Sequence, residues 1–96
     1  MGIVASGLVH QKEIAERISR LEDAFSEDIS RIDFRYGEDW TGDPSIFLTA
    51  YLTAQGGSDE RFRKLVADFP LQLVMQVDSE EFGLHSYFDF VSGSRQ

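Results

Sequence analysis

The feature that most constrains this chain is a change in the spacing of its apolar residues. Between residues 10 and 28 they recur at intervals of four, three and four, at Ile14, Ile18, Leu21 and Phe25. This spacing predicts an amphipathic helix with one apolar stripe. From residue 31 the interval becomes two, because Ile32, Phe34 and Tyr36 alternate with charged residues. Alternation of this kind is typical of a β-strand with one buried face.

The later segments continue both patterns. We expect a second strand over 46–53, a second helix from Ser58 to Phe69, a third strand over 71–77 and a fourth over 84–91. Pro70 is expected to end the second helix, since proline disfavours helical backbone at the residue before it. The third strand is predicted from the alternation of Leu71, Leu73, Met75 and Val77 with other residues. The expected order of elements is αββαββ.

This order predicts an α+β fold with a four-stranded, mainly antiparallel sheet. Each helix has a single apolar stripe, so both helices are expected to cover the same face of the sheet. The favoured strand order, 3-4-2-1, is that of a permuted ferredoxin-like sandwich, and the alternative is a plain meander with the helices packed on it. The 96 residues predict one domain, with frayed ends over 1–7 and 92–96.

Composition excludes several classes of function. The chain has 17 acidic and 9 basic residues, a formal net charge of −8, which argues against nucleic acid or an anionic membrane as partner. It has no cysteine, so a disulfide scaffold, a thiol nucleophile and a Cys-ligated metal are excluded. We expect no metal and no cofactor. With no membrane-length apolar run and no cationic leader, the expected location is the cytoplasm.

The predicted sheet has one face that no element of the chain is left to cover. That face mixes charged and aromatic side chains: Arg31, Asp33, Arg35, Phe47, Thr49, Tyr51, Val74, His85, Tyr87 and Asp89. Exposed surfaces of this kind commonly mark contact sites. We therefore expect the face to bind a second copy, giving a homodimer, or another protein.

The segment from Gly37 to Ser45 is longer than the turn that would suffice to join two strands. It contains three carboxylates, Glu38, Asp39 and Asp43, and the only tryptophan, Trp40. The carboxylates could hold a hard cation or serve in acid–base chemistry, and Trp40 could anchor a partner. Alternatively, Trp40 fills the core at the edge of the sheet, and the acids are solvated or pair with the arginines of the preceding strand.

Two segments carry a resemblance. The run from Arg35 to Phe47 contains Gly-Glu-Asp-Trp-Thr-Gly-Asp-Pro, and a later run, from Gly83 to Phe90, reads Gly-Leu-His-Ser-Tyr-Phe-Asp-Phe. The chain resembles a group of small, mostly uncharacterised bacterial proteins with a GEDW[ST]GDP segment and a late GLxxYFxF strand. The resemblance implies that the Trp40 loop and the last strand lie together in space. It implies no catalytic role for any residue.

The sequence favours a non-enzymatic, acidic protein-interaction module, in the manner of a dimerising adaptor or an antitoxin. Its expected interaction residues are Trp40, Arg31, Arg35, Phe47, Tyr51, His85 and Tyr87. The alternative is a small enzyme, or a ligand- or cation-binding protein, whose site is the 37–45 loop with Glu38, Asp39 and Asp43.

Overall fold

The structure is a computed structural model and describes residues 10–92. Its elements are α2 (Gln11–Ala24), β1 (Ile29–Glu38), β2 (Pro44–Leu52), α3 (Asp59–Gln76), the 3₁₀ helix η1 (Ser79–Phe82) and β3 (His85–Ser92). The frayed end expected over 1–7 lies outside the described residues, as do 93–96, whereas Ser92 belongs to β3. In the described part of the chain, no helix is both long and apolar enough to cross a membrane.

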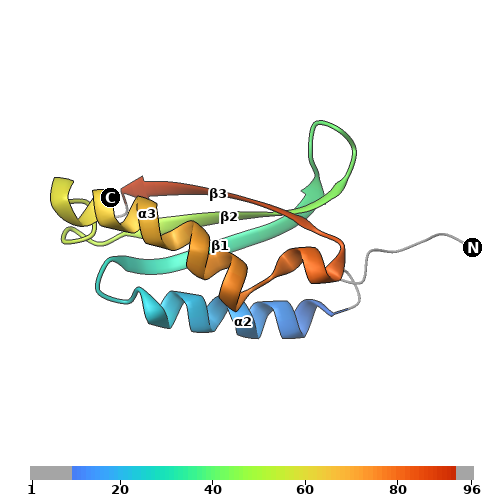
Figure 1. The fold of residues 1–96 in the computed structure, drawn as a ribbon, viewed down its shortest axis with the longest axis horizontal. Helices are drawn as coiled ribbons and strands as arrows, with labels where there is room; N and C mark the ends of the chain where they lie inside the picture. The colour runs from blue at the N-terminus through green and yellow to red at the C-terminus, as the bar shows by residue number, and fades with distance from the viewer. Residues whose placement is uncertain (1–9, 93–96) are drawn as a thin grey trace, which may run out of the picture.

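The three strands form one mixed sheet in the order β1-β2-β3. β1 and β2 are an antiparallel hairpin in which Arg35 lies opposite Phe47. β3 lies on the other side of β2 and runs parallel to it, with Tyr87 opposite Phe47. Both helices lie on one side of the sheet, and α3 is the crossover between the two parallel strands (Figure 1).

The expected four-stranded, mainly antiparallel sheet is therefore wrong. Residues 71–76, expected as the third strand, continue α3, so the order is αββαβ and the sheet has three strands. The permuted ferredoxin-like order and the meander both needed a fourth strand, and neither forms from residues 10–92. Val74, expected on the open sheet face, lies on α3 with 61% of its surface exposed.

The error has a physical cause in the spacing of the buried residues of α3. Leu65, Phe69, Leu73 and Val77 are all buried and recur every four residues, which places them on one stripe of the helix. Pro70 removes one backbone hydrogen bond, at a cost of about 3 kcal/mol. Burying Leu73 and Val77 contributes roughly 1.5–3 kcal/mol each, so continuing the helix through the proline is favoured.

The core lies between the sheet and the two helices. The side chains that alternate inward from β2 pack against the apolar stripes of α2 and α3, and Arg17 of α2 donates to the carbonyl of Val77 at 3.0 Å, which fixes the end of α3. The buried apolar residues are Ile14, Ile18, Leu21, Ile29, Ile32, Ile46, Leu48, Ala50, Leu52, Leu65, Phe69, Leu73, Val77, Phe82 and Leu84.

The acidic end of α2 is compensated by a residue from α3. Negative charge at a helix C-terminus is unfavourable, because the helix dipole is negative there. The Arg61 guanidinium contacts the carboxylates of Asp28 at 2.7 Å and Glu27 at 3.2 Å, and so places a positive charge at this end of the molecule. The same junction brings Gly56 so close to Asp28 that a Cβ at residue 56 would lie 2.1 Å from the Asp28 carbonyl oxygen.

Candidate functional site

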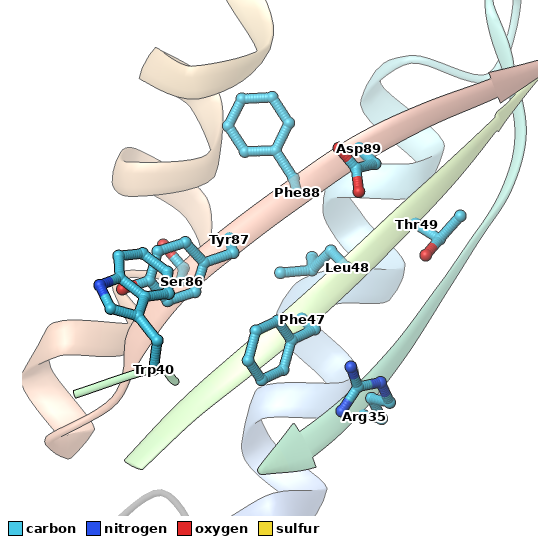
Figure 2. A pocket seen from close by; sticks show the side chains of 9 residues that line it. All are labelled: Arg35, Trp40, Phe47, Leu48, Thr49, Ser86, Tyr87, Phe88 and Asp89. Carbon is cyan, nitrogen blue, oxygen red and sulfur yellow. The ribbon is translucent and has the colours of Figure 1, made fainter. Parts of the chain in front are cut away.

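The open face of the sheet carries a row of stacked side chains that runs across all three strands. The Arg35 guanidinium carbon lies 4.4 Å from the centroid of the Phe47 ring, and Phe47 stacks on Tyr87 with centroids 5.5 Å apart. Trp40 follows, with its ring centroid 5.3 Å from that of Tyr87. Figure 2 shows the four side chains in this order, and we call them the aromatic ladder: Arg35, Phe47, Tyr87 and Trp40.

Strand register builds the ladder. Arg35, Phe47 and Tyr87 are direct partners in neighbouring strands, so their side chains leave the sheet on the same face. Gly37 lies on this face two residues after Arg35 and pairs with Ser45 of β2. A Cβ at residue 37 would lie 3.4 Å from the Arg35 guanidinium and 3.5 Å from the Phe47 ring. Both are ordinary van der Waals distances, so residue 37 borders the stacked pair directly.

The Trp40 loop is shorter than expected, because β1 reaches Glu38 and β2 begins at Pro44. Asp39 organises what remains. Its Oδ1 accepts hydrogen bonds from the amides of Thr41 (2.9 Å) and Asp43 (3.1 Å) and from the Thr41 hydroxyl (2.6 Å). Its Oδ2 accepts a hydrogen bond of 2.8 Å from the hydroxyl of Tyr87. One carboxylate therefore both orders the loop and fastens it to β3.

These hydrogen bonds determine the protonation of both partners. The Thr41 hydroxyl, the Tyr87 hydroxyl and two loop amides favour the charged carboxylate, and they hold the pKa of Asp39 well below its usual range. The hydrogen bond to Asp39 raises the pKa of Tyr87 above its ordinary value, since the phenol must keep its proton to donate. At neutral pH the pair is a carboxylate and a neutral phenol.

Asp43 and His85 complete a polar cluster beside the ladder. The His85 Nε2 lies 3.4 Å from the Asp43 Oδ2, and ligand-type atoms of Asp39, Asp43 and His85 all lie within 4.8 Å of one another. Carboxylates and imidazoles are both common metal ligands. Glu38, the third loop carboxylate predicted as a candidate ligand, is exposed on β1 and is not part of the cluster.

The other predicted interaction residues lie further along the same face. The Arg31 guanidinium stacks on the Tyr51 ring at 4.3 Å and contacts the Asp33 carboxylate at 3.3 Å. The first of these contacts repeats the Arg35–Phe47 pair further along the sheet, since Arg31 is paired with Tyr51 in the strand register. The structure thus places all seven predicted interaction residues on one side of the sheet or in the adjoining loop.

A shallow hollow of about 510 Å³ lies against the ladder. It is lined by the four ladder residues, by Thr49 and Asp89 of the open face, and by residues 48, 86 and 88. The side chain of Phe88 points towards α3 (Figure 2). Trp40 is 81% exposed and so does not fill the core, which answers one of the alternatives that the sequence left open. The hollow combines apolar ring faces with one cation and one carboxylate.

Two features of the site were not predicted from the residues. The hydrogen bond between Asp39 and Tyr87 joins positions 48 residues apart, and the contact of Asp43 with His85 also spans much of the chain. Only the resemblance placed this loop beside the last strand, and the two do lie together. Searches against protein-family models, curated proteins and solved structures find no match for this chain, so the resemblance stays a prediction.

Proposed function

We propose that this protein is a non-enzymatic, acidic interaction module that binds another protein through its open sheet face and Trp40 loop. The observation that carries the proposal is the aromatic ladder, which ends in a tryptophan with 81% of its surface exposed. Tryptophan, tyrosine and arginine are the residue types most enriched at binding hot spots. Here three of them stand in one row on a surface that no described element covers.

The inner side chains of the ladder are held by contacts within the chain. Phe47 is held between Arg35 and Tyr87, and the Tyr87 hydroxyl is fixed by Asp39. Preorganised side chains lose little conformational entropy on binding, which favours affinity. The net charge of −8 gives the molecule a negative field, so a basic protein is the partner whose approach it would accelerate.

The test is affinity capture from the source cell with the wild-type chain and two variants. Trp40→Ala removes the exposed end of the ladder, and Leu71→Ala removes an apolar side chain of α3 that is 59% exposed. We expect a basic protein to be captured by the wild type and by Leu71→Ala but lost with Trp40→Ala. Trp40→Ala should change the free energy of unfolding by less than about 0.5 kcal/mol, because an exposed side chain contributes little to packing.

Two results would contradict the proposal. One is capture that Trp40→Ala leaves unchanged, and the other is the absence of any protein specifically captured by the wild type. The polar cluster supplies the alternative function, since its three ligand-type atoms lie within 4.8 Å. If Mn²⁺, Zn²⁺ or Ca²⁺ raises the melting temperature of the wild type but not of Asp43→Asn, the cation-binding alternative is favoured instead.

A further inference from the structure

β3 has a free edge. It is the last strand of the sheet, so only β2 is hydrogen-bonded to it, and every second residue turns its amide and carbonyl groups outward. Among residues 10–92, no other group bonds to the backbone of residues 85–91. The strand contains no proline or lysine, two residues that commonly protect an edge.

The opposite edge of the sheet, formed by β1, is protected against pairing with a further strand. The Glu22 carboxylate of α2 accepts a hydrogen bond of 2.7 Å from the amide of Ile32 in β1. The register of β1 also shifts between Ile29 and Arg31, and the strand carries charged side chains at 31, 33, 35 and 38. Bulges and charges of this kind oppose the addition of a further strand. The sheet therefore offers one edge for pairing.

An apolar row of α3 flanks the free edge on the helix side. Val66, Pro70 and Val74 are spaced by four residues and share one stripe of the helix. Val74 lines a small hollow with Ser86 at the start of β3, while Val66 lies beside Phe62, which contacts Phe90 near its end. Val66 is 45% and Val74 61% exposed. A strand added to β3 would cover this row.

The middle of this row is uncharged, although Asp78 and Glu80 line the hollow beside Val74 and Asp59 lines the one beside Val66. Residues 69–77 of α3 and its C-cap include no charged side chain, and β3 contains one acid, Asp89. The stretch around Pro70 and Val74 therefore brings no charge of its own to a contact between two copies. In an antiparallel pair of β3 strands with Tyr87 at the two-fold axis, each His85 lies opposite the Asp89 of the other copy, which makes the edge complementary to itself.

We propose that a second copy of this chain pairs with β3 in antiparallel fashion, forming a six-stranded sheet with the Val66–Pro70–Val74 rows of the two α3 helices in contact. Because each protomer has one open edge, pairing of like edges closes at two copies and does not continue into a fibre. The inference uses the edge of β3 and a face of α3, and it shares Tyr87 with the aromatic ladder and His85 with the polar cluster. It places the two ladders on one continuous sheet face.

The first experiment is sedimentation velocity on the wild type and on two neighbouring variants of α3. Val74→Glu alters the apolar row, and Met75→Glu alters a residue that is 66% exposed and about 100° further round the helix. We expect twice the 10.9 kDa chain mass for the wild type and Met75→Glu, and the chain mass for Val74→Glu. A monomeric wild type would overturn the proposal, as would a Val74→Glu variant that remains dimeric.

The second experiment tests the register of the proposed β3–β3 pair. Because the chain has no native cysteine, any disulfide must come from the introduced residues. Direct partners in an antiparallel pair have Cα atoms about 4.5–5.5 Å apart, which is within the range that a disulfide spans. The double variant His85→Cys/Asp89→Cys should form covalent dimers under mild oxidation, while each single variant should not. Failure of the double variant to cross-link would overturn the proposed pairing, whatever the outcome of the capture experiment.

Discussion

Asp39 is the side chain on which the geometry of the loop depends most. It accepts three hydrogen bonds within the loop and one from β3, so its charge is shared among several donors. Groups that stabilise a carboxylate in the folded state lower its pKa below the value in the unfolded chain. The stability that Asp39 contributes is therefore present above the unfolded pKa, about 3.9, and is lost as the pH falls through the lower folded value.

We predict that Asp39→Asn lowers the free energy of unfolding at pH 7 by more than it does at pH 3. Asparagine keeps one carbonyl oxygen for the loop amides, but its amide nitrogen cannot accept the hydrogen bond from Tyr87. The difference between wild type and variant should be constant from pH 7 to about pH 5 and should shrink below about pH 4. Urea unfolding at each pH measures it, and a difference that persists unchanged at low pH would contradict this account.

At the scale of the element, the sequence of the second half of α3 is compatible with either a strand or a helix, and the two differ in which residues they bury. A strand over 71–77 would put Leu71 and Leu73 on the same face, whereas the helix leaves Leu71 59% exposed and Leu73 only 4% exposed. We predict that Leu73→Ala lowers the free energy of unfolding by about 2–5 kcal/mol. Leu71→Ala should change it by less than about 0.5 kcal/mol. Denaturant unfolding of the two variants measures this, and equal losses would favour the strand.

The choice between strand and helix for residues 71–77 cannot be made from the local sequence. Residues 71–77 satisfy an interval of two, through Leu71, Leu73, Met75 and Val77, while Leu65, Phe69, Leu73 and Val77 satisfy an interval of four. A short apolar run cannot be assigned by periodicity alone. The burial of Leu73 and Val77 against the sheet decides between the two, and that packing is known only once the fold is known. By contrast, α2, β1, β2 and β3 have a single periodicity each, and their existence and type were predicted.

Part of the candidate site could be predicted from the sequence: which side chains share a face of the sheet. Their order in space could not. Strict alternation in three strands fixes which side chains share a face, so Arg35, Phe47 and Tyr87 were expected on the open side. Their order in space depends on which strands are neighbours, and alternation within a strand does not reveal that β3 pairs in parallel with β2. The contact of Asp39 with Tyr87 follows from that pairing, because it brings the loop at the start of β2 to the start of β3.

For the whole molecule, the distribution of charge matters more than its sum. A net charge of −8 on 96 residues opposes self-association at long range, yet residues 69–77 beside the free edge carry no charged side chain. Pairing at that edge joins apolar side chains and backbone hydrogen bonds, which act at short range.

A dimer of this kind has a thermal stability that depends on protein concentration, because unfolding releases two chains. A tenfold increase in concentration favours the folded dimer by about 1.4 kcal/mol, which for roughly 200 residues corresponds to a rise in melting temperature of about 3–5 °C. We predict this rise for the wild type and for Met75→Glu, measured by calorimetry over two decades of concentration. Val74→Glu should melt at a temperature independent of concentration, since its carboxylate would be buried without a partner in the paired state. A wild-type melting temperature that does not change with concentration would show that each chain unfolds alone, and the open edge of β3 would then be a surface that the acidic protein leaves unpaired.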